Sequence, residues 1–295
     1  MVVIQKRTSY RRFVLEKRDR TVQGLLRDRS PAVRTLRSSH DDHEATCDAV
    51  ADALRELGVT AEIRSVDDEA PIVGARLVVT VGGDGTLLAA SHLVGSGVPI
   101  VGINSSPTSS VGFFCAGRKG SERALLSAAL SQTLKQVHLT RMWVERNGVA
   151  LSARVLNEAL FCHASPAATS RYILRLRASG RRAVEEEQRS SGLWIGPAAG
   201  STAAQRSAGG RVLPLGSPDL QFVVREPYTP LGKTLAMRKG LVAPGGRLEL
   251  VNKMHEAKIF LDGQTRVFDV RYGDEIVMRA SPEPLTVLGL VRRKW

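Results

Sequence analysis

The first 135 residues alternate between two hydrophobic patterns, one typical of buried strands and one typical of amphipathic helices. Residues 75–81 (ARLVVTV) and 98–104 (VPIVGIN) are nearly continuous apolar runs, as in strands buried on both faces of a parallel sheet. Residues 38–57 repeat apolar side chains at helical spacing, Ser39 is placed to cap this helix, and Gly58 follows its end. Further strands are predicted at 2–5 and 61–66, and further helices at 86–96 and 120–134. This order predicts an α/β domain with a mostly parallel sheet.

From residue 136 the pattern changes to short strands separated by turns. Asn147-Gly148 stands between two strand-like runs, which is the strongest short signal for a β-hairpin. Similar short strands are predicted at 171–179, 220–227, 247–251, 257–263 and 274–280. We therefore predict an antiparallel β-sandwich domain at residues 136–295, following the α/β domain at residues 1–135. The pattern of the tail, residues 285–295, fits either the β domain or a return to the first domain.

Residues 196–210 (GPAAGSTAAQRSAGG) interrupt the β pattern with small side chains. They lack the bulk of a strand or of a packed helix. Small side chains let backbone N–H groups come close to a ligand, so we predict a binding loop here. The alternative is an extended loop that packs poorly.

Residues 82–86 (GGDGT) join the predicted strand at 75–81 to the predicted helix at 86–96. The first turn of a helix offers free N–H groups and a partial positive charge, so a phosphate group can bind there. Asp84 would repel that phosphate, but it suits a base acting on a hydroxyl group beside the phosphate, or a ligand for Mg²⁺. The alternative is a Gly-Asp-Gly turn in which Asp84 only caps the helix.

Composition narrows the class of protein. The net charge of +13 attracts anions such as nucleotides, although it can also serve solubility alone. Aromatic residues are few and are not interleaved with the basic ones, so we predict no nucleic-acid partner. No run reaches the roughly eighteen apolar residues of a membrane helix, so no membrane partner is predicted. Residues 1–20 lack the apolar core of a secretory signal, and Glu16 and Asp19 make an arginine-rich transit peptide the less favoured interpretation. Three widely spaced cysteines favour a reducing cytoplasm.

Four more segments follow GGDGT in order: residues 101–104 (VGIN), Asn157-Glu158 within LNEAL, residues 199–210 (AGSTAAQRSAGG) and residues 260–264 (FLDGQ). From roughly residue 70 to residue 265, this series resembles the NAD kinase family. Phosphofructokinases and lipid kinases share GGDGT, but their other motifs are missing here. The resemblance implies transfer of the terminal phosphoryl group of ATP, with Mg²⁺, to the 2′-hydroxyl of the adenosine ribose of NAD or NADH.

The resemblance also implies a role for each candidate residue. Asp84 would take the proton from the 2′-hydroxyl group. The donor phosphates would bind at Gly82, Gly83, Gly85 and Thr86. The dinucleotide would be bound by Asn104, Phe113, Asn157, Glu158, Thr202, Ala203 and Ser207. No side chain is assigned as a metal ligand. The site is expected in the cleft between the two domains, and a homo-oligomer, either a dimer or a tetramer, is expected from the relatives.

Several of these residues have a purely structural alternative. Asn157 and Glu158 can read paired hydroxyl groups, but they can also cover a strand end. Phe113 can be a core phenylalanine. The histidines of residues 40–43 (HDDH) look like a metal pair, but no third ligand is evident, so we predict a solvated helix face. Asp262 is interpreted as part of a hairpin turn.

The chain departs from the family at residues 197–204. Where the family has Thr-Pro-Thr-Gly-Ser-Thr-Ala-Tyr, this chain has Pro-Ala-Ala-Gly-Ser-Thr-Ala-Ala, so Ala204 replaces a tyrosine. Ser191 likewise replaces a family aspartate. The loop is most similar to the plant-type NADH kinase branch, which leaves the choice between NAD and NADH open. A lipid kinase acting on diacylglycerol or sphingosine, and a non-catalytic dinucleotide sensor, are the two alternative functions.

Overall fold

The chain divides into two compact units in the computed structural model, which describes residues 1–180, 182–232 and 234–290. The first unit comprises residues 1–137 together with residues 285–290, and the second comprises residues 138–284. The sequence placed the boundary after residue 135 and left the path of the tail open. In the structure the tail contributes β19 (Leu285–Leu288), which pairs in parallel with β4 (Ile100–Asn104) of the first unit.

The first unit is built on a seven-stranded sheet of order β2-β1-β3-β4-β19-β6, with β5 also paired to β4. Its other strands are β1 (Val2–Gln5), β2 (Glu62–Ser65), β3 (Val78–Gly82), β5 (Cys115–Arg118) and β6 (Gln136–Leu139). Every pairing whose register is described in this sheet is parallel. All residues of β3 and β4 are buried. The predicted parallel sheet with continuously apolar central strands is therefore confirmed.

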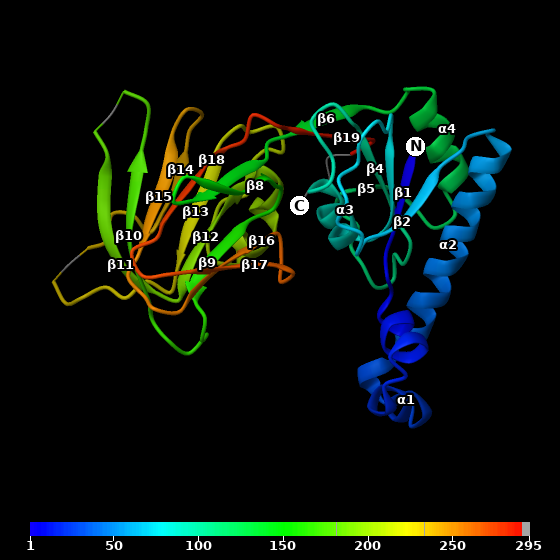
Figure 1. Cartoon of the computed structure of the whole chain (residues 1–295), viewed down its shortest axis with the longest axis horizontal. Helices are drawn as coiled ribbons and strands as arrows, with labels where there is room; N and C mark the ends of the chain where they lie inside the picture. Colours follow the sequence, from blue (N-terminus) through cyan, green and yellow to red (C-terminus); the bar gives the residue numbers. More distant parts are fainter. Residues whose placement is uncertain (181, 233, 291–295) are drawn as a thin grey trace. The chain divides into compact units, whose positions relative to one another are not determined.

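Helices cover both faces of this sheet (Figure 1). The helix α2 (Leu36–Glu56) and the helix α4 (Glu122–Leu130) share a core with alternate residues of the strands, such as Val101 and Ile103. Gly102 lies between these two residues and faces the other side, where a Cβ on it would lie 3.1 Å from Leu87 of α3 (Asp84–Ser91). The helix α3 therefore packs on the opposite face.

The long helix α2 starts earlier than predicted. It begins at Leu36 after Thr35, so Ser39 lies inside the helix and the predicted cap at Ser39 is wrong. Gly58 follows its end with φ of +66°, which fits the predicted stop. Before α2 the chain forms three short helical segments that the hydrophobic pattern did not predict: η1 (Arg11–Glu16), α1 (Arg20–Arg27) and η2 (Pro31–Val33).

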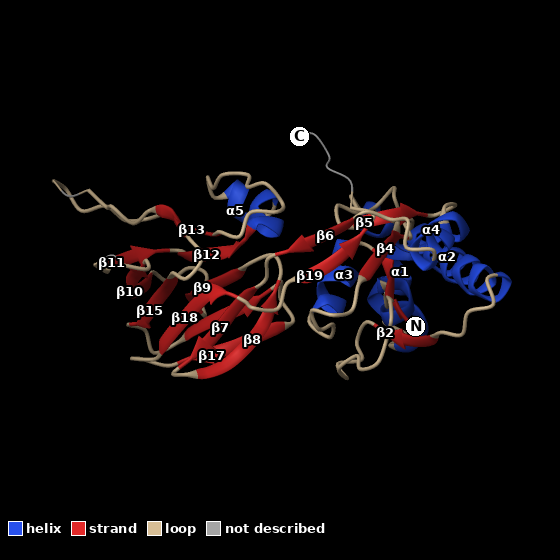
Figure 2. Cartoon of the chain, turned by 90° about the horizontal axis from the view of Figure 1, so that it is seen from above, coloured by secondary structure: helices blue, strands red, loops and turns tan. Residues whose placement is uncertain are grey.

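The second unit consists of two six-stranded sheets (Figure 2). The first has the order β11 (Val184–Ser190), β10 (Ser170–Arg177), β15 (Arg247–Asn252), β18 (Glu275–Ala280), β7 (Met142–Arg146), β8 (Val149–Val155). The second has the order β14 (Lys239–Val242), β13 (Leu220–Arg225), β12 (Gly192–Pro197), β9 (Ala159–His163), β16 (Ala257–Leu261), β17 (Arg266–Val270). Phe161 of β9 packs edge-on against Tyr172 of β10, within one apolar core formed by both sheets. The antiparallel β-sandwich is confirmed.

Two local predictions for the second unit can be compared directly with the backbone. Asn147 and Gly148 both have positive φ, 51° and 77°, and form the two-residue turn between β7 and β8 as expected. The small-residue segment forms a 3₁₀ turn, η3 (Ala198–Thr202), and one helical turn, α5 (Ala204–Ser207).

None of the helices in the described part of the chain combines the length and apolar character needed to cross a bilayer.

Candidate functional site

The GGDGT segment lies where β3 ends and α3 begins, at the carboxyl edge of the parallel sheet. Ligands of open α/β sheets bind outside this edge. Gly83 is the residue before the first helical turn, and no side chain accepts a hydrogen bond at this cap. The N–H groups of Thr86 and Leu87 reach back to the carbonyl oxygen of Gly83, at 3.0 and 3.3 Å. The start of α3 therefore lacks the side-chain acceptor that usually neutralises a helix N-terminus.

Asp84 is fixed by a distant residue rather than by its own helix. Its Oδ1 accepts a hydrogen bond of 2.7 Å from the backbone N–H of Phe114. The side chain is half-buried, and for the residues that the structure describes its Oδ2 has no hydrogen-bond partner. The alternative that Asp84 merely caps α3 is therefore not what the structure shows. One oxygen orients the carboxylate, and the other is free to accept a proton.

The three glycines of this segment are needed for different reasons. A Cβ on Gly82 would overlap Oγ1 and Cβ of Thr86, so the protein's own packing excludes a side chain there. A Cβ on Gly83 would overlap Ser110 Oγ, so a side chain there would require Ser110 to move. Gly85 is exposed, and a Cβ on it would have no atom within 4 Å. Thr86, in contrast, is buried against Gly82. Only at Gly85 does the missing side chain leave open space for a ligand.

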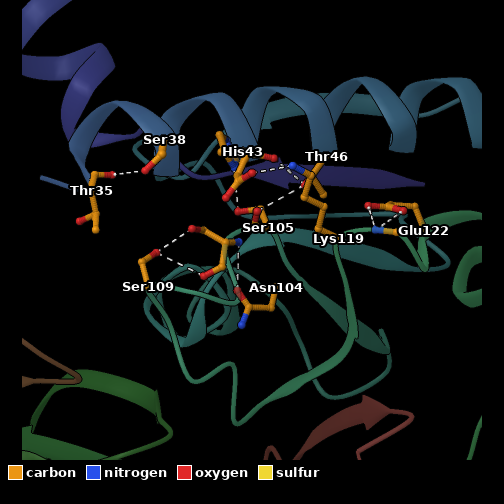
Figure 3. Close-up of polar contacts among 12 residues, drawn as sticks. Thr35, Ser38, His43, Thr46, Asn104, Ser105, Ser109, Lys119 and Glu122 are labelled. Atoms are coloured by element: carbon orange, nitrogen blue, oxygen red, sulfur yellow. Dashed lines mark hydrogen bonds and ion pairs between the residues drawn. The ribbon is translucent and has the colours of Figure 1, made fainter.

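Asn104 organises the loop that carries Phe113 and Phe114. Its Nδ2 donates to the carbonyl oxygen of Ser110 (3.0 Å), and its Oδ1 accepts from the N–H of Ser106 (3.2 Å). Figure 3 shows Asn104 beneath the long helix, beside this loop. Phe113 is half-buried and meets Phe114 edge-on, with ring centroids 5.0 Å apart. The structure thus links the predicted residues of the first unit, because the loop shaped by Asn104 also supplies the N–H that holds Asp84.

The histidines of residues 40–43 are buried, so the predicted solvated face is wrong. His43 Nδ1 lies 3.0 Å from Ser105 Oγ, next to Asn104 (Figure 3). His40 Nδ1 lies 2.9 Å from Thr8 Oγ1, and its ring stacks on Tyr10. Burial lowers the pKa of His43 to about 4, so this side chain is neutral at physiological pH. Both histidines join α2 to loops at the carboxyl edge of the sheet.

In the second unit, Asn157 and Glu158 lie in the short connection between β8 and β9. The carboxylate of Asp262, in the turn between β16 and β17, accepts three hydrogen bonds from this connection. Its Oδ2 accepts from the N–H of Leu156 (2.7 Å), and its Oδ1 accepts from the N–H groups of Asn157 (2.7 Å) and Glu158 (3.1 Å). The sequence assigned Asp262 only to a turn, because its partners are more than a hundred positions away.

Among the described residues, one side-chain oxygen of Asn157 and one of Glu158 are buried without a hydrogen-bond partner. Asn157 Oδ1 and Glu158 Oε2 are inaccessible to solvent, and neither has a hydrogen-bond partner among the described residues. Burial, with a smaller contribution from the charge of Asp262, raises the pKa of Glu158 to about 7. Buried polar atoms are nearly always hydrogen-bonded in native proteins, so these two oxygens point to a bound ligand or water.

The small-residue loop lies directly against Asn157. A Cβ on Gly196 or on Gly200 would overlap the carbonyl oxygen of Asn157. These two glycines therefore serve the approach of the protein's own backbone, whereas the sequence suggested the approach of a ligand. Within the same loop Thr202, Ala203 and Ala204 are half-buried, and Ser207 is exposed. The predicted residues of the second unit thus form a second connected group.

Known proteins resemble this chain over most of its length. The family described as the ATP-NAD kinase N-terminal domain matches residues 14–116. A probable NADH kinase of Oryza sativa subsp. japonica is 33% identical over 263 residues, covering 83% of this chain and 81% of the relative. The NADH kinase of Arabidopsis thaliana is 35% identical over 251 residues, covering 74% of each chain.

Two crystal structures share the fold at low sequence identity. An NAD kinase from Archaeoglobus fulgidus in complex with ATP matches with a TM-score of 0.66 and 19% identity, covering 97% of this chain and 92% of that one. A yeast NADH kinase complexed with NADH matches with a TM-score of 0.71 and 16% identity, covering 100% of this chain and 84% of that one. These matches support the α/β plus antiparallel β architecture.

Gly200 lacks a side chain because the backbone of Asn157 lies against it, whereas Gly85 faces open space. Substituting the two glycines should therefore affect stability differently. Gly200→Ala should lower the free energy of unfolding by about 1–3 kcal/mol or more, because the new methyl group overlaps the Asn157 carbonyl. Gly85→Ala should leave it unchanged or raise it by up to about 1 kcal/mol, because Gly85 is helical and faces open space. Urea unfolding of both variants measures this. A Gly200→Ala protein as stable as the wild type would contradict the packing described here.

Proposed function

Because this chain belongs to the NAD kinase family and is an NAD(H) kinase, we propose that Asp84 is the base of the phosphoryl transfer. It takes the proton from the 2′-hydroxyl of the adenosine ribose while that oxygen attacks the terminal phosphorus of ATP and ADP leaves. The supporting observation is the hydrogen bond from the Phe114 N–H to Asp84 Oδ1, which orients the carboxylate and leaves Oδ2 free. A base must first be positioned within reach of its proton, and this contact supplies that positioning.

The donor phosphates bind at the start of α3, in this proposal, through the backbone of Gly82, Gly83, Gly85 and Thr86. The support is the N-terminus of α3, which has no side-chain cap, and the open space at Gly85. Mg²⁺ would neutralise the phosphates. In this proposal the ion is bound mainly by the phosphates of ATP, with Asp84 as a nearby carboxylate.

Lys6 follows β1 directly and lies beside this donor site. A Cβ on Gly82 would lie 3.1 Å from the Lys6 Cβ, so the Lys6 side chain begins next to the last residue of β3. Burial lowers the pKa of Lys6, and in the part of the chain that the structure describes no acceptor pairs with its ammonium group. Such a cation suits the charge of a donor phosphate.

The dinucleotide is bound, in this proposal, by Asn104, Phe113, Asn157, Glu158, Thr202, Ala203 and Ser207. The strongest support is the pair of buried, unpartnered oxygens on Asn157 and Glu158, which can accept hydrogen bonds from ribose hydroxyl groups. A homo-oligomer and a cytoplasmic location are further parts of the proposal. The latter is supported by the three cysteines, all of which are free thiols.

The first experiment incubates purified protein with Mg-ATP and NAD or NADH and assays the phosphorylated dinucleotide. Asp84→Asn should cut turnover by a factor on the order of a hundred or more, because it removes the base. Its folding should be unchanged, because the asparagine Oδ1 can still accept from the Phe114 N–H. Thermal melting is the control. Turnover within a factor of about two of wild type would reject the base role.

The replacement of the family tyrosine by Ala204 predicts an effect on substrate choice. Ala204→Tyr should lower kcat/KM for NADH relative to NAD by a few-fold, because the added ring would narrow the space for the puckered dihydronicotinamide. The matched control is Ala208→Tyr, four positions further along the same small-residue segment, which should leave the ratio unchanged. Equal kcat/KM ratios in wild type and Ala204→Tyr would refute this explanation.

The donor role of Lys6 predicts a selective loss of ATP binding. Lys6→Met should raise KM for ATP by roughly tenfold, as expected for a lost charge-assisted hydrogen bond, with little change in KM for NAD. Arg7→Met removes the same charge from the next residue, whose guanidinium pairs with Glu16 and Asp67, and it should not change KM for ATP. Steady-state kinetics of both variants decide the matter. Equal effects of the two substitutions would show only a general dependence on net charge.

A further inference from the structure

We propose that Asp262 is a positioning residue for the dinucleotide: by holding three consecutive N–H groups, it fixes the Asn157–Glu158 segment in the form that binds the ribose. This inference rests on the proposed dinucleotide role of Asn157 and Glu158. It assigns to Asp262 no contact with substrate.

The contacts between Asp262 and this segment run in both directions. Its carboxylate accepts from the N–H groups of Leu156, Asn157 and Glu158, and its own N–H donates to the Glu158 carbonyl oxygen at 2.9 Å. Residues 156–158 lie between β8 and β9, where the ladder does not satisfy their N–H groups. Asp262 therefore takes the place of a neighbouring strand for these three residues.

The turn alone does not explain an aspartate at this position. Asp262 has φ of +50°, a conformation that glycine or asparagine adopts at least as easily. Asparagine, however, has one side-chain acceptor oxygen, and glycine has none. Three N–H donors converge on both carboxylate oxygens, so the requirement for an acid comes from residues 156–158 and not from the turn.

The opposite side of the segment is held by the small-residue loop. The carbonyl oxygen of Asn157 lies so close to Gly196 and Gly200 that neither could carry a side chain. Gln205 Nε2 also approaches this oxygen, at 3.5 Å. The Asn157 backbone is therefore enclosed at its N–H by Asp262 and at its carbonyl by the loop, while its side-chain oxygen has no hydrogen-bond partner in the described part of the chain. The Asn157 backbone is thus held through its own N–H and carbonyl groups, so the polar atoms of its side chain are not needed to hold it.

Asp262 also affects how Glu158 ionises. Its charge adds to burial in raising the pKa of Glu158 to about 7. Asp262 also interacts electrostatically with Arg141, which is buried and lies near Arg154 and Glu283. Removing the charge of Asp262 should lower the pKa of Glu158. The part of the pH profile of kcat/KM for NAD that reflects the ionisation of Glu158 should then move to lower pH.

Kinetics of Asp262→Asn test the proposal. We expect KM for NAD to rise about tenfold or more while KM for ATP changes by less than about twofold. The limb of the kcat/KM profile for NAD near pH 7 should move by about half a unit or more toward lower pH. In a Glu158→Gln background, which removes the titrating carboxyl group, Asp262→Asn should move the profile no further.

The matched control is Asp274→Asn in another turn of the same unit. Asp274 also accepts a backbone N–H, from Arg271 at 2.8 Å, and a side-chain hydrogen bond from Asn147 at 2.7 Å. It should change stability but neither KM for NAD nor the pH profile. Unchanged NAD kinetics in Asp262→Asn, or the same shift in both variants, would overturn the positioning role.

A second measurement uses the wild-type protein and does not depend on the variants folding. The amides of residues 156–158 should exchange hydrogen at least about a hundredfold more slowly than those of exposed loops, although they lie outside the strands. Fast exchange would overturn the proposal. If the wild type makes no phosphorylated dinucleotide, the proposed function fails instead, and slow exchange would show that the anchoring still holds.

Discussion

The hydrogen bond from the Phe114 N–H to Asp84 Oδ1 is the contact on which the chemistry proposed for the first unit depends. A carboxylate in the first turn of a helix normally turns back to bind that helix's own free N–H groups. Here a residue thirty positions later binds the carboxylate, and the residue before the helix is a glycine without a side chain. The helix terminus and the acid are therefore held apart, as the proposed phosphate-binding and base roles require.

The second unit uses an aspartate in a different way. Asp262 accepts three backbone hydrogen bonds with both oxygens, whereas Asp84 accepts one hydrogen bond with one oxygen. A carboxylate that accepts backbone N–H groups with both oxygens can hold a backbone in place. A carboxylate that is bound through one oxygen is oriented and leaves the other oxygen open to a substrate. The number of hydrogen bonds that each carboxylate accepts thus separates the anchor from the proposed base, although both acids stand beside a glycine in the sequence.

Sequence patterns predicted the features whose causes are local. The buried strands β3 and β4, the Asn147-Gly148 turn and the GGDGT segment each depend on residues within a few positions, and the structure has them where they were expected. Some local features were also missed, such as the true start of α2 and the short helical segments before it. Other features depend on contacts between distant segments. The burial of His43 depends on Ser105, and the work of Asp262 depends on residues 156–158. Periodicity along one helix cannot show which loop will cover it.

Burial by distant segments also sets the charge of residues such as Glu158 and His43. NAD brings a diphosphate, so a permanently ionised carboxylate at the proposed dinucleotide residue Glu158 would weaken its binding. Burial raises the pKa of Glu158 to about 7, so near neutral pH its carboxylate is less fully ionised than an exposed one and repels an anion less. His43, neutral because it is buried, adds no positive charge near Asn104. In the proposed function, the attraction for donor phosphates then falls to the N-terminus of α3 and to Lys6, both at the carboxyl edge of the sheet that carries Asp84. The proposal thereby assigns attraction for the donor to one unit and recognition of hydroxyl groups to the other.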